Sequence, residues 1–138
     1  MRRVYALILV LSMVVAGCVQ APSGEDPAAL LAQADALLDE ERPADAIPLI
    51  EEALAREDSA EGHFLLGNAY SHSDRLTEAE DEYLQALALD PDHVDARANL
   101  AVVYYSSGRL EEAEEAIRLA LEGHEGDADL HYNLGGIL

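Results

Sequence analysis

The sequence predicts an all-α protein, an α-α superhelix built from tandem helix-turn-helix repeats. The first observation is an internal register of 34 residues, since LGNAY at 66–70 is followed by LAVVY at 100–104 and LGGIL at 134–138. Within the units, apolar and small residues fall at helical spacing. Turn-forming Gly, Pro, Ser and Asp residues interrupt that spacing. The register therefore divides the array into units 27–59, 60–93 and 94–127, with a partial unit at 128–138.

The chain begins with the features of a signal peptide that is removed. Met1 is followed by two arginines, and residues 4–15 are apolar except for Ser12. A membrane-spanning helix needs about 20 apolar residues, so this run is too short to cross a bilayer comfortably. It has the length of a signal-peptide core, and the small Ala16 and Gly17 suit a cleavage site. Residues 1–17 are therefore predicted to be a signal peptide.

The only cysteine, Cys18, decides which kind of signal is expected. The stretch Val15-Ala16-Gly17-Cys18 resembles the lipobox of prokaryotic lipoproteins. That resemblance implies that Cys18 receives a diacylglycerol and palmitate anchor and becomes the new N-terminus, with residues 18–26 as lipidated cysteine and tether. The expected location is the cell envelope, on the outer face of the cytoplasmic membrane or in the outer membrane. An uncleaved anchor with an incidental cysteine is the alternative.

The first unit, 27–59, contains a proline inside its second helical segment. Pro48 looks like a helix breaker. If Asp45 is the N-cap, Pro48 falls at the third helical position, where its missing N–H has no partner to lose. The second helix of this unit is therefore expected to begin near Asp45.

The second and third units contain clearer signals for where helices begin and end. Thr77 and Glu80 have the spacing of a capping box, which predicts a helix start at Thr77. The stretches 90–92 (DPD) and 106–108 (SSG) are turn signals. Each unit is thus expected to contain two helices and two short turns, and no unit can bury its apolar faces alone, so stacking is obligatory.

These units resemble the tetratricopeptide repeat, whose pattern prefers Leu at repeat position 7, Gly or Ala at 8, Tyr at 11 and Ala at 20 and 27. The second unit departs from it at His63, the third at Arg97 and Glu125, and the first at Gln33. The resemblance implies that small residues at positions 8 and 20 let the paired helices approach closely. The matching residues of the second unit are Leu66, Gly67, Tyr70, Ala79, Tyr83, Ala86 and Pro91.

The resemblance also implies a concave groove, lined by the first helix of each unit, that holds an extended peptide or a partner helix. The side chains at its groove positions include a row of asparagines, which suit a peptide backbone, and a row of carboxylates. A common Asn-Leu pairing and simple solvation are the alternative explanations of these two rows. The candidate groove residues are Glu61, Phe64, Asn68, Asp95, Asn99, Val102, Tyr105, Asp129 and Asn133.

Charge narrows the partners. The chain has 28 Asp and Glu residues against 8 basic ones, all arginine, which gives a formal net charge of -20. Nucleic acid is therefore excluded as a partner, and a neutral or basic protein segment is favoured over an acidic one. An acidic surface without lysine resembles proteins of salt-loving prokaryotes, although high-GC coding would produce the same bias.

No enzyme signature is present: Gly-x-Ser-x-Gly, phosphate-loop and HExxH motifs are all missing from the sequence. No catalytic residue, metal ligand or cofactor is predicted. The expected function is a membrane-anchored scaffold or adaptor, in the assembly of an envelope or surface complex. The alternative is an N-terminal accessory repeat region of a longer envelope enzyme, because residues 128–138 begin a unit that lacks its second helix and suggest that the chain continues past Leu138.

Overall fold

The computed structural model describes residues 24–122 together with 124, 126, 128, 131, 132 and 135. The predicted signal peptide, Cys18 and the groove candidates Asp129 and Asn133 lie outside the described residues. The described part is all-α and contains no strand. Its helices are α1 (Pro27–Asp39), α2 (Pro43–Arg56), α3 (Ala60–His72), α4 (Leu76–Leu89), α5 (Val94–Ser106) and α6 (Leu110–Leu121).

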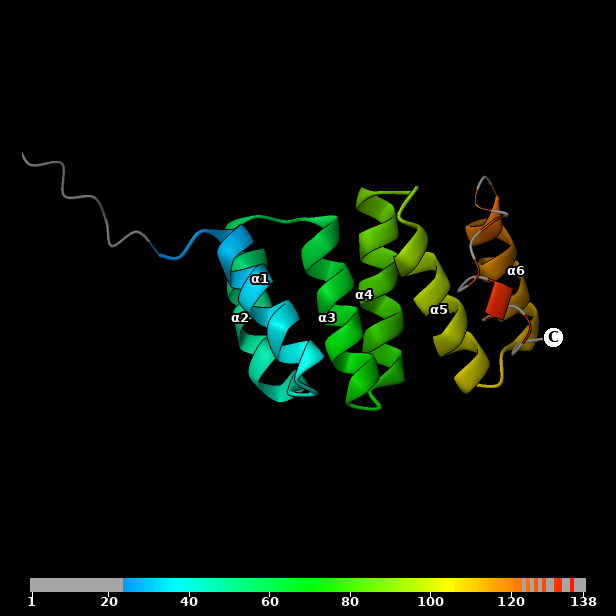
Figure 1. The fold of residues 1–138 in the computed structure, drawn as a ribbon, viewed down its shortest axis with the longest axis horizontal. Helices are drawn as coiled ribbons and strands as arrows, with labels where there is room; N and C mark the ends of the chain where they lie inside the picture. Colours follow the sequence, from blue (N-terminus) through cyan, green and yellow to red (C-terminus); the bar gives the residue numbers. More distant parts are fainter. Residues whose placement is uncertain are drawn as a thin grey trace, which may run out of the picture.

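The helices form three pairs that stack along the long axis of the molecule (Figure 1). Each pair packs within itself, α1 with α2, α3 with α4 and α5 with α6, and each successive pair contacts the one before it. One pair falls within each of the three complete units that the register predicts. The predicted fold class, an α-α superhelix of helix-turn-helix repeats, is confirmed.

The array has an inner and an outer side. Helices α1 and α3 contact each other, as do α3 and α5, whereas α2, α4 and α6 make no such contact with one another in the described part of the chain. The stack is therefore curved, because the first helices of neighbouring units contact each other and the second helices do not. Its concave face is consequently formed by α1, α3 and α5.

Small residues set the distance between the paired helices. A Cβ atom added to Gly67 on α3 would lie 2.6 Å from the ring of Tyr83 on α4, and Tyr83 is only 1% exposed. In the third unit the equivalent pair is Ala101 with Ile117, both fully buried. The larger side chain thus faces glycine and the smaller one faces alanine, as close packing requires.

The turn inside each unit repeats the same geometry. The backbone N–H of Arg42, Arg75 and Arg109 donates to the carbonyl oxygen five residues earlier, at 2.8 Å, 2.9 Å and 2.9 Å. This pattern is a Schellman-type helix end, which places the preceding residue in the left-handed region. Those residues are Glu41, Asp74 and Gly108, with φ of 57°, 58° and 75°.

Two predicted helix starts are wrong for a shared reason. Helix α2 begins at Pro43 with Arg42 before it, so Pro48 lies inside the helix and Asp45 is not the N-cap. Helix α4 begins at Leu76, which places Thr77 within the first turn and removes the predicted capping box. In both cases the Schellman-type turn fixes where the next helix begins, and local capping preferences yield to it. The ring of Pro48 lies on the exposed side of α2.

Candidate functional site

The concave face contains two hollows in succession. The first lies between α1 and α3, has a volume of about 400 Å³ and is called the apolar compartment here. The second lies between α3 and α5, has a volume of about 230 Å³ and is called the amide compartment. The apolar compartment is lined by Pro27, Ala28, Leu31, Ala32, Asp35, Glu57, Ser59, Glu61 and Leu65. The amide compartment is lined by Asn68, Ser71, His72, Tyr83, Asn99 and Val102.

The apolar compartment combines an apolar lining with carboxylates. Leu31 and Leu65 are buried members of one core cluster, and the small side chain of Ala32 leaves space beside them. The carboxylates of Asp35 and Glu57 line the same hollow and are exposed. Neither makes an ion pair with any residue in the part of the chain that the structure describes. An apolar hollow lined by unneutralised carboxylates suits a ligand that is both apolar and cationic.

One wall of the apolar compartment is the connection between α2 and α3, and side chains hold it in place. The Ser59 hydroxyl caps α3 by accepting a hydrogen bond from the Gly62 N–H at 3.2 Å. His63 is hydrogen-bonded through Nδ1 to Glu82 at 2.6 Å and through Nε2 to Asp58 at 2.8 Å. The histidine that departs from the repeat pattern thus ties this connection to α3 and α4.

The amide compartment is built around one oxygen atom. The Tyr83 hydroxyl donates to Asn68 Oδ1 at 2.7 Å, and Asn99 Nδ2 donates to the same oxygen at 2.9 Å. Burial raises the pKa of Tyr83, which keeps its hydroxyl protonated and able to donate. A carboxamide oxygen accepts two hydrogen bonds, so the Asn68 amide N–H groups and the Asn99 oxygen remain for a ligand.

The predicted groove residues that the structure describes divide into those that line a hollow and those that do not. Asn68, Asn99 and Val102 meet in the amide compartment, and Glu61 lines the apolar one. Exposed positions that line neither hollow are Asp95 and Tyr105.

Phe64 is half-buried and packs between units. Its ring lies 4.7 Å from the ring of His93 and 6.2 Å from that of Tyr83. His93 also accepts from the Ala96 N–H at the start of α5 and lies 3.9 Å from Glu61. Phe64 therefore packs in the core beneath the concave surface, and it lines neither compartment.

Sequence reasoning missed the contribution of the first unit. Ala28, Leu31, Ala32 and Asp35 all line the apolar compartment. They occupy repeat positions 2, 5, 6 and 9 of the unit that starts at Pro27, the same positions used to choose candidates in later units. The register alone was a sufficient signal for them.

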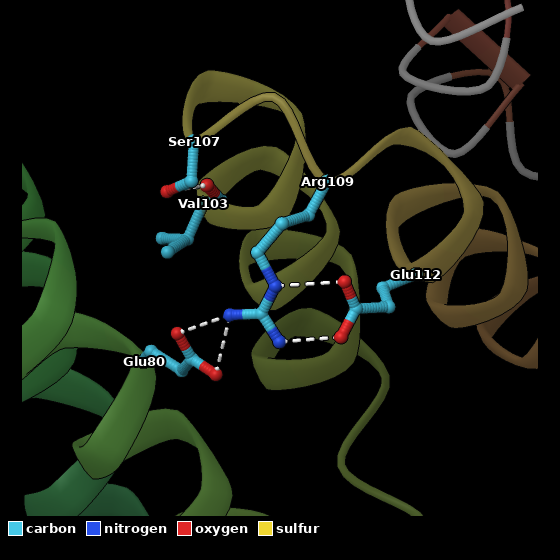
Figure 2. Close-up of polar contacts among 5 residues, drawn as sticks. All are labelled: Glu80, Val103, Ser107, Arg109 and Glu112. Atoms are coloured by element: carbon cyan, nitrogen blue, oxygen red, sulfur yellow. Dashed lines mark hydrogen bonds and ion pairs between the residues drawn. The ribbon is translucent and has the colours of Figure 1, made fainter.

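The arginines in the described residues are all bonded elsewhere. Arg109 lies between Glu80 on α4 and Glu112 on α6, its guanidinium 2.7 Å from one oxygen of Glu80 (Figure 2). It also lies 4.3 Å above the ring of Tyr104, and Arg75 sits over Tyr70 in the same way at 4.2 Å. Hydrogen bonds to Glu112 and Glu80 raise the pKa of Arg109. None of these arginines lines either compartment.

Stacked helix pairs with a hollowed inner face define the chain as a helical-repeat protein of the solenoid class. Two family models, both described as tetratricopeptide repeat, match residues 31–92 and 82–135. Residues 31–135 of the chain therefore contain tetratricopeptide repeats.

The chain is similar both to curated protein sequences and to solved structures. A curated relative, the Drosophila melanogaster protein O-mannosyl-transferase Tmtc3, is 35% identical over 86 residues, which is 61% of this chain and 9% of that protein. Among solved structures, MamA is similar with a TM-score of 0.74 and 28% identity over 80% of this chain and 66% of that one. The first repeat domain of Spaghetti (RPAP3) bound to the HSP90 peptide SRMEEVD has a TM-score of 0.77 at 17% identity over 81% and 90%. This chain therefore spans about a tenth of the transferase.

The described residues contain neither a membrane-spanning helix nor a metal-binding cluster. None of the helices that the structure describes is long and apolar enough to cross a membrane. No group of three or more His, Cys, Asp or Glu side chains in that part of the chain is arranged to hold a metal ion.

Proposed function

We propose that this protein is a lipid-anchored scaffold or adaptor whose concave groove binds an extended segment of another protein. The observation that carries the proposal is the succession of an apolar and an amide compartment along α1, α3 and α5. An extended peptide offers both of the features that these hollows match. Its side chains can enter an apolar hollow, while its backbone offers one donor and one acceptor at each residue.

The amide compartment supports backbone recognition. Asn68 has donors to offer and Asn99 has an acceptor, because the Asn68 oxygen is already occupied by Tyr83 and Asn99. A peptide unit that places its C=O beside Asn68 and its N–H beside Asn99 satisfies both groups. Such pairing does not depend on the ligand's side chains, so it favours binding of many sequences with the same geometry.

The charge of the groove favours a neutral or basic segment. The peptide bound by the Spaghetti domain is acidic, SRMEEVD. In this chain the apolar hollow is lined by Asp35, Glu57 and Glu61, neither hollow is lined by an arginine, and the sequence has no lysine. An acidic tail would bring like charges together at the groove.

The proposed anchor rests on the lipobox-like stretch before Cys18. Attachment there places the array at a membrane surface in the cell envelope, where it recruits or positions a component of an envelope or surface complex. Mass spectrometry of the mature protein is expected to show an N-terminal, lipid-modified Cys18. An unmodified Cys18 with Met1 still attached would refute the anchor.

Site-specific crosslinking tests the groove. A photoreactive amino acid at Val102, on the concave face, should yield a crosslinked partner in cells. The same group at Leu84 on the outer helix α4, which is exposed to a similar degree (42% against 40%), provides the matched control. Equal crosslinking of one partner from both positions would exclude the groove as the binding site.

A second candidate function is suggested by the similarity to part of the O-mannosyl-transferase. In this candidate the repeats are the accessory region of a longer envelope enzyme, with the catalytic domain beyond Leu138. Sequencing the gene past codon 138 distinguishes the two candidates. Further repeats support the scaffold, whereas a region of different composition supports the enzyme.

A further inference from the structure

The apolar compartment specifies more than a peptide of any sequence. Its apolar side chains are contributed by α1 and α3, and its three carboxylates come from three different elements: Asp35 from α1, Glu57 from the end of α2 and Glu61 from α3. The carboxylates therefore surround the hollow from several sides and do not form a charged stretch along a single helix. A volume of about 400 Å³ lies within the range of small-ligand sites.

The charge of this hollow is not balanced from within. The basic partner of Glu61 is the His93 ring at 3.9 Å, and Asp35 and Glu57 make no ion pair with any described residue. By contrast, Arg56 at the end of α2 is occupied by Glu52 and by the Glu25 carbonyl oxygen. A cationic ligand group can therefore pair with these carboxylates without displacing an arginine.

We infer that the apolar compartment binds a large aliphatic side chain that is directly flanked by arginine or lysine in the partner segment. This inference rests on the proposed function, since it names the kind of segment the groove takes. The aliphatic side chain contacts Leu31 and Leu65, and Ala32 leaves the space it fills. The flanking cation lies beside Asp35 and Glu57, where it meets no competing arginine.

The neighbouring amide compartment fixes the register of such a segment. The two hollows share α3 but use different parts of it, the apolar one near Glu61 and Leu65 and the amide one near Asn68 and Ser71. They are therefore separated by about one helix-to-helix spacing across α3, roughly 8–10 Å, and by about 10 Å along it. An extended chain covers the resulting distance of roughly 14 Å in about four residues. The aliphatic-basic pair should therefore lie about four residues from the backbone unit that pairs with Asn68 and Asn99.

Peptide binding to the full chain, purified in detergent, tests the inference by fluorescence anisotropy. Three labelled peptides share a Ser/Asn background and differ only at two central positions, which read Leu-Arg, Leu-Glu or Ser-Arg. Leu-Arg should bind tightest, and each of the other two should bind roughly tenfold more weakly, from lost charge attraction and lost apolar burial respectively. Equal binding of Leu-Glu and Leu-Arg would overturn the inference.

Two variants assign these effects to the compartment. Asp35→Asn with Glu57→Gln should reduce the preference for Leu-Arg over Leu-Glu about fivefold, whereas Glu51→Gln on the outer helix α2 should leave it unchanged. Ala32→Phe fills the hollow and should remove the preference for Leu over Ser. Ala36→Phe, at another exposed alanine of α1, is its matched control.

The outcomes separate this inference from the proposed function. If the peptides bind and an Asn99→Ala variant weakens all three equally, but the compartment variants change nothing, the groove binds segments without the aliphatic-basic preference and the inference is wrong. If none of the peptides binds and crosslinking at Val102 yields no partner, the proposed function fails as well. Because Asp35, Glu57 and Ala32 are exposed, thermal melts of these variants should match the parent chain.

Discussion

The groove has two steps, the first between α1 and α3 with the apolar compartment and the second between α3 and α5 with the amide compartment. The two steps differ in their lining although the helical scaffold beneath them is the same. At repeat position 9 the first step has Asp35 where the second has Asn68, and at position 6 of the following helix it has Leu65 where the second has Asn99. The result is an apolar hollow lined by carboxylates in one step and a hydrogen-bonded amide pair in the other. Differences at a few register positions, these two among them, therefore change the chemistry of the groove without changing its architecture.

The contacts on the outer side of the array also differ between the two steps. Arg109 of the third unit reaches back to Glu80 of the second. Its equivalent, Arg75, bonds Glu78 within its own unit, because Ile47 stands where a reach toward the first unit would need a carboxylate. Among the described residues, an arginine–carboxylate pair between units thus supplements apolar packing in the second step, whereas the first step has the contact between His63 and Asp58.

The largest expected effect comes from Gly67→Ala, which removes the close approach beneath the amide compartment. The added methyl would lie 2.6 Å from a Tyr83 ring that is too buried to move freely. We expect a loss of about 1–3 kcal/mol in the free energy of unfolding, measured by urea denaturation. Alanine at this position would otherwise favour the helix, so an increase in stability would show that the Tyr83 ring yields easily.

The matched control for this variant lies in the third unit. Ala101→Gly faces the smaller Ile117 and creates space where Gly67→Ala removes it. Its cost should be about 0.5–1 kcal/mol, the usual penalty of glycine inside a helix, plus a small loss of packing. A larger effect for Ala101→Gly than for Gly67→Ala would contradict the assigned contact.

Tyr83→Phe should have the next largest effect. The substitution leaves the packing in place and removes the hydroxyl that donates to Asn68, at a cost of about 0.5–1.5 kcal/mol. The apolar compartment lies outside this contact, so the Leu-over-Ser preference of a bound peptide should persist while overall affinity falls. A loss of that preference would mean that the two compartments are coupled.

The same residue makes stability depend on alkaline pH. Burial raises the pKa of Tyr83 above its ordinary value near 10, so the fold favours the protonated hydroxyl. Its contribution is complete below pH 10 and is lost as the pH rises above that value. In Tyr83→Phe this part of the alkaline loss should disappear, leaving only the smaller dependence from Tyr70 and Tyr104, whose pKa values burial also raises. Identical alkaline profiles for the two proteins would contradict this assignment.

The scaffold could be predicted from the sequence to a greater extent than the binding site. The scaffold was predictable because close packing restricts positions such as Gly67 and Tyr83, and the 34-residue register makes that restriction visible. The use of Asn68 was not, because a pattern shows that an amide lies at a groove position but not that Tyr83 and Asn99 share its oxygen. Tertiary contacts between units decide which polar groups remain for a ligand, and neither propensity nor spacing reports them.

Glu80→Gln tests the polar link between the second and third units. It should lower the melting temperature by about 2–4 °C, because Arg109 keeps Glu112 but loses its charged partner on α4. Glu78→Gln, which affects only the pair inside the second unit, is the control and should have a smaller effect. The difference should vanish at high salt, where the ion pair is screened. A larger loss for Glu78→Gln would show that the cross-unit contact adds nothing to the second step.

The smallest expected effect concerns the turns between the two helices of each unit. Glu41 and Gly108 occupy the same left-handed position in the first and third units, with φ of 57° and 75°. Glutamate is strained there and glycine is not, so Glu41→Gly should stabilise the chain by about 0.5 kcal/mol, since relief of strain exceeds the greater entropy of unfolded glycine. Asp74→Gly should gain less, because aspartate tolerates this conformation better. Gly108→Ala reverses the change and should destabilise the chain in the same denaturation assay. If Glu41→Gly also loses stability, the first turn is held by contacts of its glutamate side chain, and the two ends of the array differ in their turns as well as in their grooves.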